Sequence, residues 1–258
     1  MSRPDPKPPR SAGGPVPFSV VDSARRQALV ARLAQEEDPA PGSAGVGADK
    51  AMLSAQRELW IRLAEECSSA LSLMDAPRTI GVTSCLRREG RTTIAIAMGL
   101  AQSINFGRVT ILMDQDLERP SLAKMMGANS GPGLAEVLRG EATLASCVQW
   151  VGKNLGVLAA GDTGNSASKL VPMLMARDLT AGLEDHCEAV VVDLPPFLGT
   201  GVGLARNCPK VVLVVRPGAT PLQHVRKAAA ELDKPQVILN GSAAEVPRFM
   251  RGIFGESR

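Results

Sequence analysis

The sequence predicts an α/β protein with a mostly parallel sheet and helices on both faces. Two runs, Ala189–Val192 and Val211–Val215, contain only apolar residues, and such runs are typical of strands that are buried on both sides. Helical patterns alternate with the short apolar runs, and parallel neighbouring strands need such crossovers. The third observation is a basic loop that follows one strand and opens a helix, because ligands of open α/β sheets bind at the carboxyl ends of strands.

The first fifty residues differ from the rest of the chain. Residues 1–50 contain 8 of the 19 prolines and 5 of the 25 glycines. Proline has no backbone donor, so we expect a flexible, Pro/Gly-rich tail over residues 1–50. Within it, residues 22–37 have an amphipathic pattern that indicates either a docking helix or a transient helix. We expect the globular domain over residues 51–258.

From residue 51 onward, helical periodicity and short apolar or β-branched runs predict the order of the elements. Helices are expected over residues 52–73, 92–104 and 221–232. Strands are expected over residues 78–82, 108–113, 189–192, 211–215 and 236–239.

The composition excludes several classes of protein. The net charge is 29 − 26 = +3, and 45% of the residues are hydrophobic and 21% charged, which is typical of a soluble globular chain. No run of about 18 apolar residues occurs, and the N-terminus lacks a signal-peptide pattern, so neither a membrane span nor secretion is expected. The five cysteines form no CxxC pair and are expected to be reduced thiols. Aromatic residues make up only 3%, so nucleic-acid binding through base stacking is not expected.

The loop before the second expected helix carries candidate phosphate-binding residues. It reads Ser84-Cys85-Leu86-Arg87-Arg88-Glu89-Gly90-Arg91-Thr92-Thr93. Backbone N–H groups at the N-terminus of a helix attract anions. The candidate nucleotide-binding residues are therefore Arg88, Gly90, Arg91, Thr92 and Thr93, and the Thr92 hydroxyl is also a candidate Mg²⁺ ligand. A basic turn without a ligand is the alternative for this segment alone.

Three aspartates follow expected strands. Asp114 and Asp116 come after the strand at 108–113, and Asp193 follows the strand at 189–192. Carboxylates at such strand ends suit Mg²⁺ and an attacking water. Asp114 and Asp116 are therefore candidate catalytic residues, and Asp114 and Asp193, together with Thr92, are candidate metal ligands.

Five motifs in order resemble the cytoplasmic domain of bacterial tyrosine kinases of capsule and exopolysaccharide export, which lies among the MinD/ParA-like P-loop ATPases. They are Val82-Thr83-Ser84, residues 114–122, residues 133–140, residues 155–161, and Asp193-Leu194-Pro195-Pro196. The resemblance extends from about Leu53 to Asn240. It implies a P-loop NTPase fold with ATP or ADP and Mg²⁺ as cofactors.

Departures from the family pattern lower the catalytic activity that we expect for this chain. Arg91 stands at the position of the P-loop lysine, Arg88 at that of a loop glycine, and Glu118 at that of an arginine. A non-glycine residue at a position of positive φ costs roughly 1–2 kcal/mol, and misplaced charge harms the transition state more than binding. Either weak binding of Mg-nucleotide or no binding, with very slow hydrolysis, is therefore expected. A family assembly motif, Glu-x-x-Arg-x-x-Arg, keeps only its central residue, which leaves a homo-oligomer open: the matching positions are Ser54, Arg57 and Trp60.

The chain contains no tyrosine. The resembled kinases phosphorylate a tyrosine cluster at their own C-terminus. Autophosphorylation on tyrosine is therefore chemically impossible for this chain.

These observations favour a pseudokinase-like cytoplasmic regulator of exopolysaccharide or capsule polymerisation or export. The resemblance implies a partner, the cytoplasmic tail of an inner-membrane polysaccharide co-polymerase, which would hold the protein at the inner membrane. A residual ATPase or protein kinase that acts on other proteins is the alternative, because Thr92 and the three aspartates remain. A MinD/ParA-like positioning ATPase is the second alternative, although the loop has no early lysine.

Overall fold

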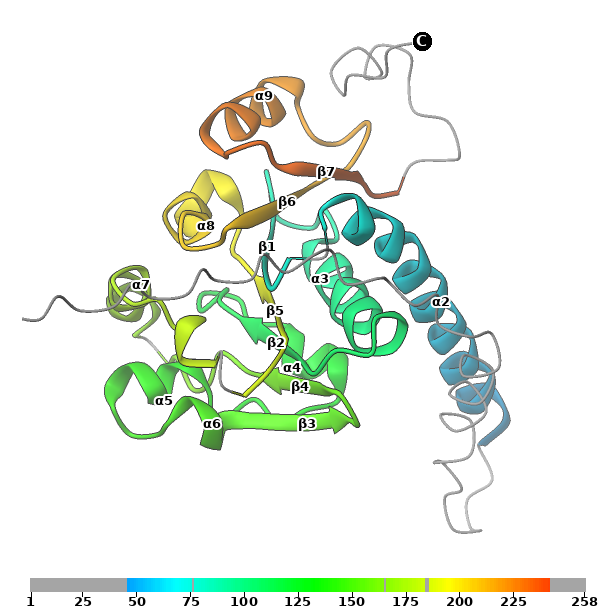
Figure 1. Cartoon of the computed structure of the whole chain (residues 1–258), viewed down its shortest axis with the longest axis horizontal. Helices are drawn as coiled ribbons and strands as arrows, with labels where there is room; N and C mark the ends of the chain where they lie inside the picture. The colour runs from blue at the N-terminus through cyan, green and yellow to red at the C-terminus, as the bar shows by residue number, and fades with distance from the viewer. Residues whose placement is uncertain (1–45, 76, 165, 184–185, 242–258) are drawn as a thin grey trace, which may run out of the picture. The chain divides into compact units, whose positions relative to one another are not determined.

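The computed structural model describes residues 46–75, 77–164, 166–183 and 186–241. These residues form a seven-stranded sheet in the order β3-β4-β2-β5-β1-β6-β7 (Figure 1). The strands are β1 (Thr79–Ser84), β2 (Thr110–Asp114), β3 (Val148–Gly152), β4 (Leu155–Leu158), β5 (Ala189–Asp193), β6 (Lys210–Val215) and β7 (Gln236–Leu239).

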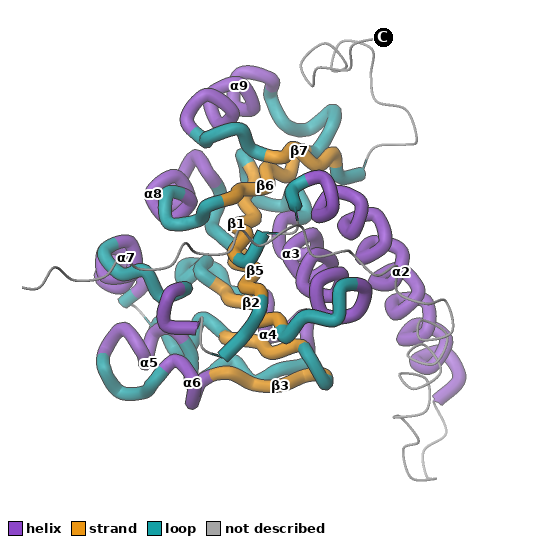
Figure 2. The backbone as a smooth tube through the Cα atoms, in the orientation of Figure 1, coloured by secondary structure: helices purple, strands orange, loops and turns teal. Residues whose placement is uncertain are grey.

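Helices cover both faces of this sheet, as Figure 2 shows with strands between two groups of helices. Helices α2 and α3 lie on one face, while α5, α7, α8 and α9 lie on the other (Figure 1). The helices are α2 (Val46–Leu73), α3 (Arg91–Leu100), α4 (Leu122–Met126), α5 (Leu134–Arg139), α6 (Leu144–Cys147), α7 (Ala167–Met175), α8 (Val202–Ala205) and α9 (Leu222–Glu231). The prediction of a mostly parallel α/β sheet is confirmed.

The sheet is parallel except at one edge, where β3 pairs with β4 in the antiparallel direction. In the register of the central strands, Asp193 at the end of β5 lies beside Val82 of β1 and Asp114 of β2. The carboxyl ends of β1, β2 and β5 therefore meet at one edge of the sheet. This edge is where the sequence places the candidate site.

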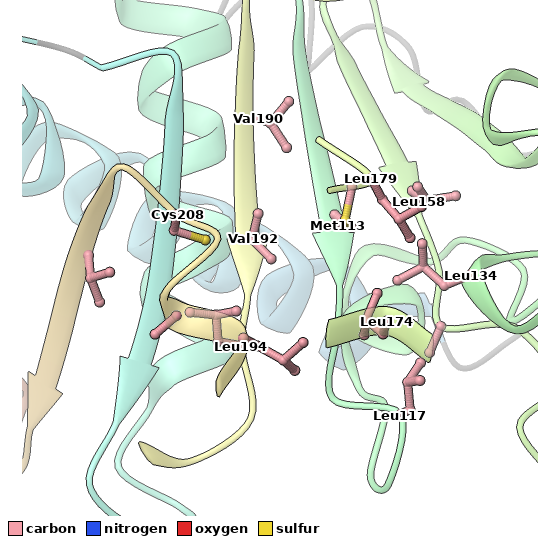
Figure 3. Close-up of a cluster of buried hydrophobic side chains, with 14 of the residues drawn as sticks. Met113, Leu117, Leu134, Leu158, Leu174, Leu179, Val190, Val192, Leu194 and Cys208 are labelled. Atoms are coloured by element: carbon pink, nitrogen blue, oxygen red, sulfur yellow. The ribbon is translucent and has the colours of Figure 1, made fainter. Parts of the chain in front are cut away.

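Each central strand contributes to two apolar cores, because successive side chains point to opposite faces. In β5, Val190 and Val192 belong to the core beneath α5 and α7, whereas Val191 belongs to the core beneath α2 and α3. Figure 3 shows the first of these cores, in which the side chain of Leu134 lies between those of Leu158 and Leu174. Burial on both faces fixes the register that brings the strand ends together.

All eight elements expected from the sequence are present. The first helix begins at Val46, six residues earlier than expected, and the helix expected over 92–104 is α3 followed by a π-helical turn, Ala101–Asn105. Strands β3 and β4 and the helices between residues 122 and 175 were not predicted from the sequence. Residues 1–45, which include most of the expected tail and its helix at 22–37, lie outside the described residues.

Among the helices that the structure describes, none combines the length and the apolar character needed to cross a membrane.

Candidate functional site

The candidate site is a pocket at the carboxyl ends of the central strands, where the loop after β1 enters α3. The pocket has a volume of about 290 Å³. All five predicted nucleotide-binding residues line it, as does Asp116, whereas Asp114 and Asp193 do not. All three aspartates are buried, with exposures of 1% or less. The lining residues are Ser84, Arg87, Arg88, Gly90, Arg91, Thr92, Thr93, Asp116, Arg119, Ser121 and Met125.

Two loop residues adopt left-handed backbone conformations. Gly90, which precedes α3, has φ +87°, and a Cβ at this position would lie 1.9 Å from Nδ2 of Asn240. Arg88 has φ +66° although it carries a side chain. This is the conformation in which a non-glycine residue is strained by roughly 1–2 kcal/mol, so the expected cost of arginine at this loop position applies.

The buried side chain of Glu89 stabilises the loop through hydrogen bonds, a role that the sequence did not predict. Its side chain is buried at 3% exposure. One carboxylate oxygen accepts a hydrogen bond from the Leu86 N–H at 2.9 Å, and the other accepts one from the Thr220 hydroxyl. The Asn240 amide donates to the Glu89 carbonyl at 2.9 Å. The only signal in the sequence was an acid within an otherwise basic loop.

Arg91, the first residue of α3, points back into the carboxylates. Its side chain is 9% exposed. Nε donates to Asp193 Oδ1 at 2.7 Å, and Nη2 donates to Asp116 Oδ2 at 2.8 Å. Burial by itself lowers the pKa of Arg91, but the charges and hydrogen bonds of Asp193 and Asp116 outweigh burial and raise it. The guanidinium therefore stays charged and bridges two carboxylates.

Thr92 supports the same arrangement. Its hydroxyl donates to Asp193 Oδ2 at 2.7 Å and lies 3.2 Å from the hydroxyl of Ser121. Both oxygens of Asp193 thus have a protein donor, one from Arg91 and one from Thr92. Burial raises the pKa of Asp193, although Arg91 and Thr92 oppose this shift.

Asp114 is bound by the backbone of the segment that follows β2. It accepts hydrogen bonds from the N–H groups of Asp116 at 3.1 Å, Ser121 at 3.0 Å and Leu122 at 3.0 Å. Burial and then the charge of Asp193 raise the pKa of Asp114 to about 7. This carboxyl group therefore shapes the β2–α4 turn and gains or loses a proton near neutral pH.

Arg87 joins the tip of the loop to the β2–α4 segment. Its guanidinium donates to Asp116 Oδ2 at 3.0 Å and to Glu118 Oε2 at 2.8 Å. Glu118, which reverses a charge of the resembled kinases, therefore has a basic partner in this chain.

The four predicted metal-binding and catalytic groups are close together, but their oxygens are engaged. Every carboxylate oxygen of the three aspartates accepts a hydrogen bond from a protein donor, and the Thr92 hydroxyl is one of these donors. Within the residues that the structure describes, no group of three or more His, Cys, Asp and Glu is arranged to hold a metal ion. The side chains in this arrangement do not fit Mg²⁺, and the metal role of Thr92, Asp114 and Asp193 stays a prediction.

Comparison with curated proteins confirms the resemblance to bacterial tyrosine kinases. The chain is 26% identical over 166 residues to the tyrosine-protein kinase Etk of Escherichia coli K12, covering 62% of this chain and 22% of Etk. It is 29% identical over 157 residues to the succinoglycan biosynthesis transport protein ExoP of Rhizobium meliloti, covering 58% and 20%. The chain therefore spans about a fifth of the length of these relatives. No family model matches the chain.

Solved structures share the fold. The kinase domain of VpsO matches with a TM-score of 0.63 and 26% identity, covering 73% of this chain and 98% of that domain. The septum site-determining protein MinD of Pyrococcus horikoshii, solved with Mg-ADP, matches with a TM-score of 0.54 and 21% identity, covering 67% and 74%. The fold is thus that of MinD-like P-loop NTPases, and one protein of this fold binds Mg-ADP.

Replacing Arg88 with glycine should stabilise the protein. Glycine removes the left-handed strain of roughly 1–2 kcal/mol from the folded state. It also increases the conformational entropy of the unfolded chain, which offsets part of this effect. We therefore expect the free energy of unfolding to rise by about 1 kcal/mol or less. Urea unfolding measures the gain. Arg88→Ala is the matched control, because it removes the same exposed side chain and keeps the Cβ. Equal stability of the two variants would contradict the strain argument.

Because of the raised pKa of Asp114, the free energy of unfolding should fall as the pH rises toward neutrality. Its folded pKa of about 7 lies above the unfolded value of 3.8, so the folded protein binds the proton more tightly. The stabilisation is complete below about pH 4 and is lost as the pH rises through about 7, a change of up to about 4 kcal/mol. The free energy of unfolding, measured across this range, should depend less on pH in Asp114→Asn than in the wild type.

The control for this measurement is Asp178→Asn. The Thr180 hydroxyl holds the pKa of Asp178 below its usual range, so this aspartate is ionised in both states across most of the measured range. The Asp178→Asn variant should therefore show the same dependence of the free energy of unfolding on pH as the wild type. A slope in Asp114→Asn equal to that of the wild type would show that Asp114 does not titrate in this range.

Proposed function

We propose that this chain is a pseudokinase-like regulator of exopolysaccharide or capsule polymerisation or export. The observation that carries the proposal is the double ion pair of Arg91 with Asp193 and Asp116, at the position of the P-loop lysine in the resembled kinases. A cation that is held by two buried carboxylates is less available to the phosphates of a nucleotide. The site keeps the residue types of an ATPase without placing their charges for catalysis.

Phosphoryl transfer depends almost entirely on positioned charge. To meet a phosphate, Arg91 would have to leave two buried carboxylates, and breaking such a pair typically costs about 3–5 kcal/mol. Loss of ~3–4 kcal/mol of transition-state stabilisation slows turnover roughly 10²–10³-fold. Binding tolerates misplaced charge better than the transition state does, so weak binding of Mg-ADP or Mg-ATP remains part of the proposal.

The polysaccharide role is supported by the relatives, which include tyrosine kinases and a succinoglycan transport protein. The chain itself has no tyrosine, so a role through its own tyrosine phosphorylation is excluded. The proposed partner is the cytoplasmic tail of an inner-membrane polysaccharide co-polymerase. This partner would place the protein in the cytoplasm, at the periphery of the inner membrane.

A residual ATPase or protein kinase is the second candidate. The observation in its favour is that Thr92 and the aspartates at 114, 116 and 193 converge at one edge of the sheet. The likeness to MinD concerns the fold alone and gives a positioning ATPase no further support.

An assay of phosphate release distinguishes the pseudokinase-like regulator from the residual enzyme. With ATP and Mg²⁺, the wild type is expected to turn over roughly 10²–10³-fold more slowly than an active kinase domain of this fold. Arg91→Lys combined with Arg88→Gly should raise the rate, because it restores a compact ammonium and an unstrained loop. Calorimetry with Mg-ADP should show weak binding or none in the wild type. Wild-type turnover comparable with the active domain, and abolished by Asp114→Ala, would support the residual enzyme instead.

The proposed partner predicts conditional membrane association. In cells that contain the co-polymerase, the protein should sediment with inner membranes, and in cells that lack it the protein should remain in the supernatant. Fractionation with a quantitative immunoblot measures both conditions, with the co-polymerase supplied again from a plasmid as the control. Equal association in cells with and without the co-polymerase would contradict this partner.

A further inference from the structure

The side chains around Arg91 leave little room for a divalent cation. A carboxylate oxygen has about two lone-pair positions. Asp116 Oδ2 receives donors from Arg91 and Arg87, and Asp114 Oδ2 receives two backbone donors at 3.0 Å each. The lone-pair positions of these two oxygens are therefore filled by protein donors.

The remaining oxygens of the cluster each have one protein donor. Asp193 Oδ1 accepts from Arg91 Nε at 2.7 Å, and Asp193 Oδ2 accepts from the Thr92 hydroxyl at 2.7 Å. Asp116 Oδ1 accepts from the Arg119 N–H at 3.2 Å. Mg²⁺ requires near-octahedral oxygen ligands at about 2.0–2.1 Å, so a Mg²⁺ ion that bound Asp193 and Asp116 together would compete with the guanidinium that now bridges them.

The charges lead to the same conclusion. Arg91 is buried at 8% exposure between two carboxylates that are each about 1% exposed. A second cation beside the guanidinium would be repelled strongly in this poorly solvated region. The guanidinium and a divalent cation therefore exclude each other.

We propose that the Arg91 guanidinium takes the place of a divalent cation between Asp116 and Asp193, so that these two carboxylates do not bind free Mg²⁺ while Arg91 is present. The inference rests on the proposed function only in treating the pocket as a former phosphoryl-transfer site. It predicts a gain of function: removal of Arg91 frees oxygens of Asp193 and Asp116 and creates a metal site. A structural arginine with no relation to a metal position would not produce this gain.

The test is a titration of the protein with Mn²⁺ in the absence of nucleotide. Electron paramagnetic resonance measures the concentration of unbound Mn²⁺ at each point of the titration. The wild type should show no saturable binding, whereas Arg91→Ala and Arg91→Gln should bind at least about tenfold more tightly. Arg91→Gln keeps most of the side-chain volume in case the alanine variant folds poorly. Millimolar Mg²⁺ should also raise the melting temperature of both variants and leave that of the wild type unchanged.

Two further variants make the result specific. Arg119→Ala removes an exposed arginine of the same pocket and is the control for a general loss of positive charge, so it should not gain Mn²⁺ binding. Arg91→Gln combined with Asp193→Asn should lose the gain, because Asp193 is a proposed ligand. Equal Mn²⁺ binding by wild type and Arg91→Gln, no binding by either, or an equal gain in Arg119→Ala would each overturn the proposal.

The two proposals can fail separately. An inactive wild type that binds Mn²⁺ would overturn the inference about Arg91 and leave the pseudokinase-like function standing. A wild type that binds no Mn²⁺ yet releases phosphate in the presence of a chelator would overturn the proposed function and leave the inference standing.

Discussion

The buried ion pair of Arg91 with Asp193 and Asp116 is the interaction on which the rest of the site depends. Arg91 is the first residue of α3, Asp193 is the last residue of β5, and Asp116 follows β2, so one guanidinium joins three elements. Charges in a poorly solvated interior must be paired, because an unpaired partner is strongly destabilising. The start of α3 is therefore fixed to the strand ends by charge as well as by the apolar core beneath it.

The same constraint links the charged side chains around Asp116. A glutamate at position 118 adds negative charge beside Asp116, and Arg87 binds both carboxylates. Arg91 neutralises Asp116 and Asp193 from the other side. The basic and acidic side chains thus neutralise each other, and the result is a closed network of ion pairs and hydrogen bonds.

The sequence predicted the central strands because they are buried on both faces and therefore apolar throughout. It did not predict β3, whose residues Trp150 and Val151 are 53% and 38% exposed, so that the strand has no continuous buried pattern. The antiparallel pairing of β3 with β4 also falls outside the alternation of strand and helix that guided the prediction. Short helices such as α6, with four residues, are too brief to show a helical period.

The order of strands and helices predicted that the site residues would converge. It did not predict that the Arg91 side chain would turn toward Asp193 and Asp116. A lysine ammonium is a compact charge on a flexible stem, whereas the planar fork of arginine makes two directed hydrogen bonds at once. The fork is held here because Asp193 and Asp116 lie at neighbouring strand ends, at a spacing set by the pairing of β2 with β5. That spacing is a property of the sheet register and not of the loop sequence. An arginine at the start of α3 can therefore join strand ends as well as contact a ligand, and only the three-dimensional arrangement distinguishes the two roles.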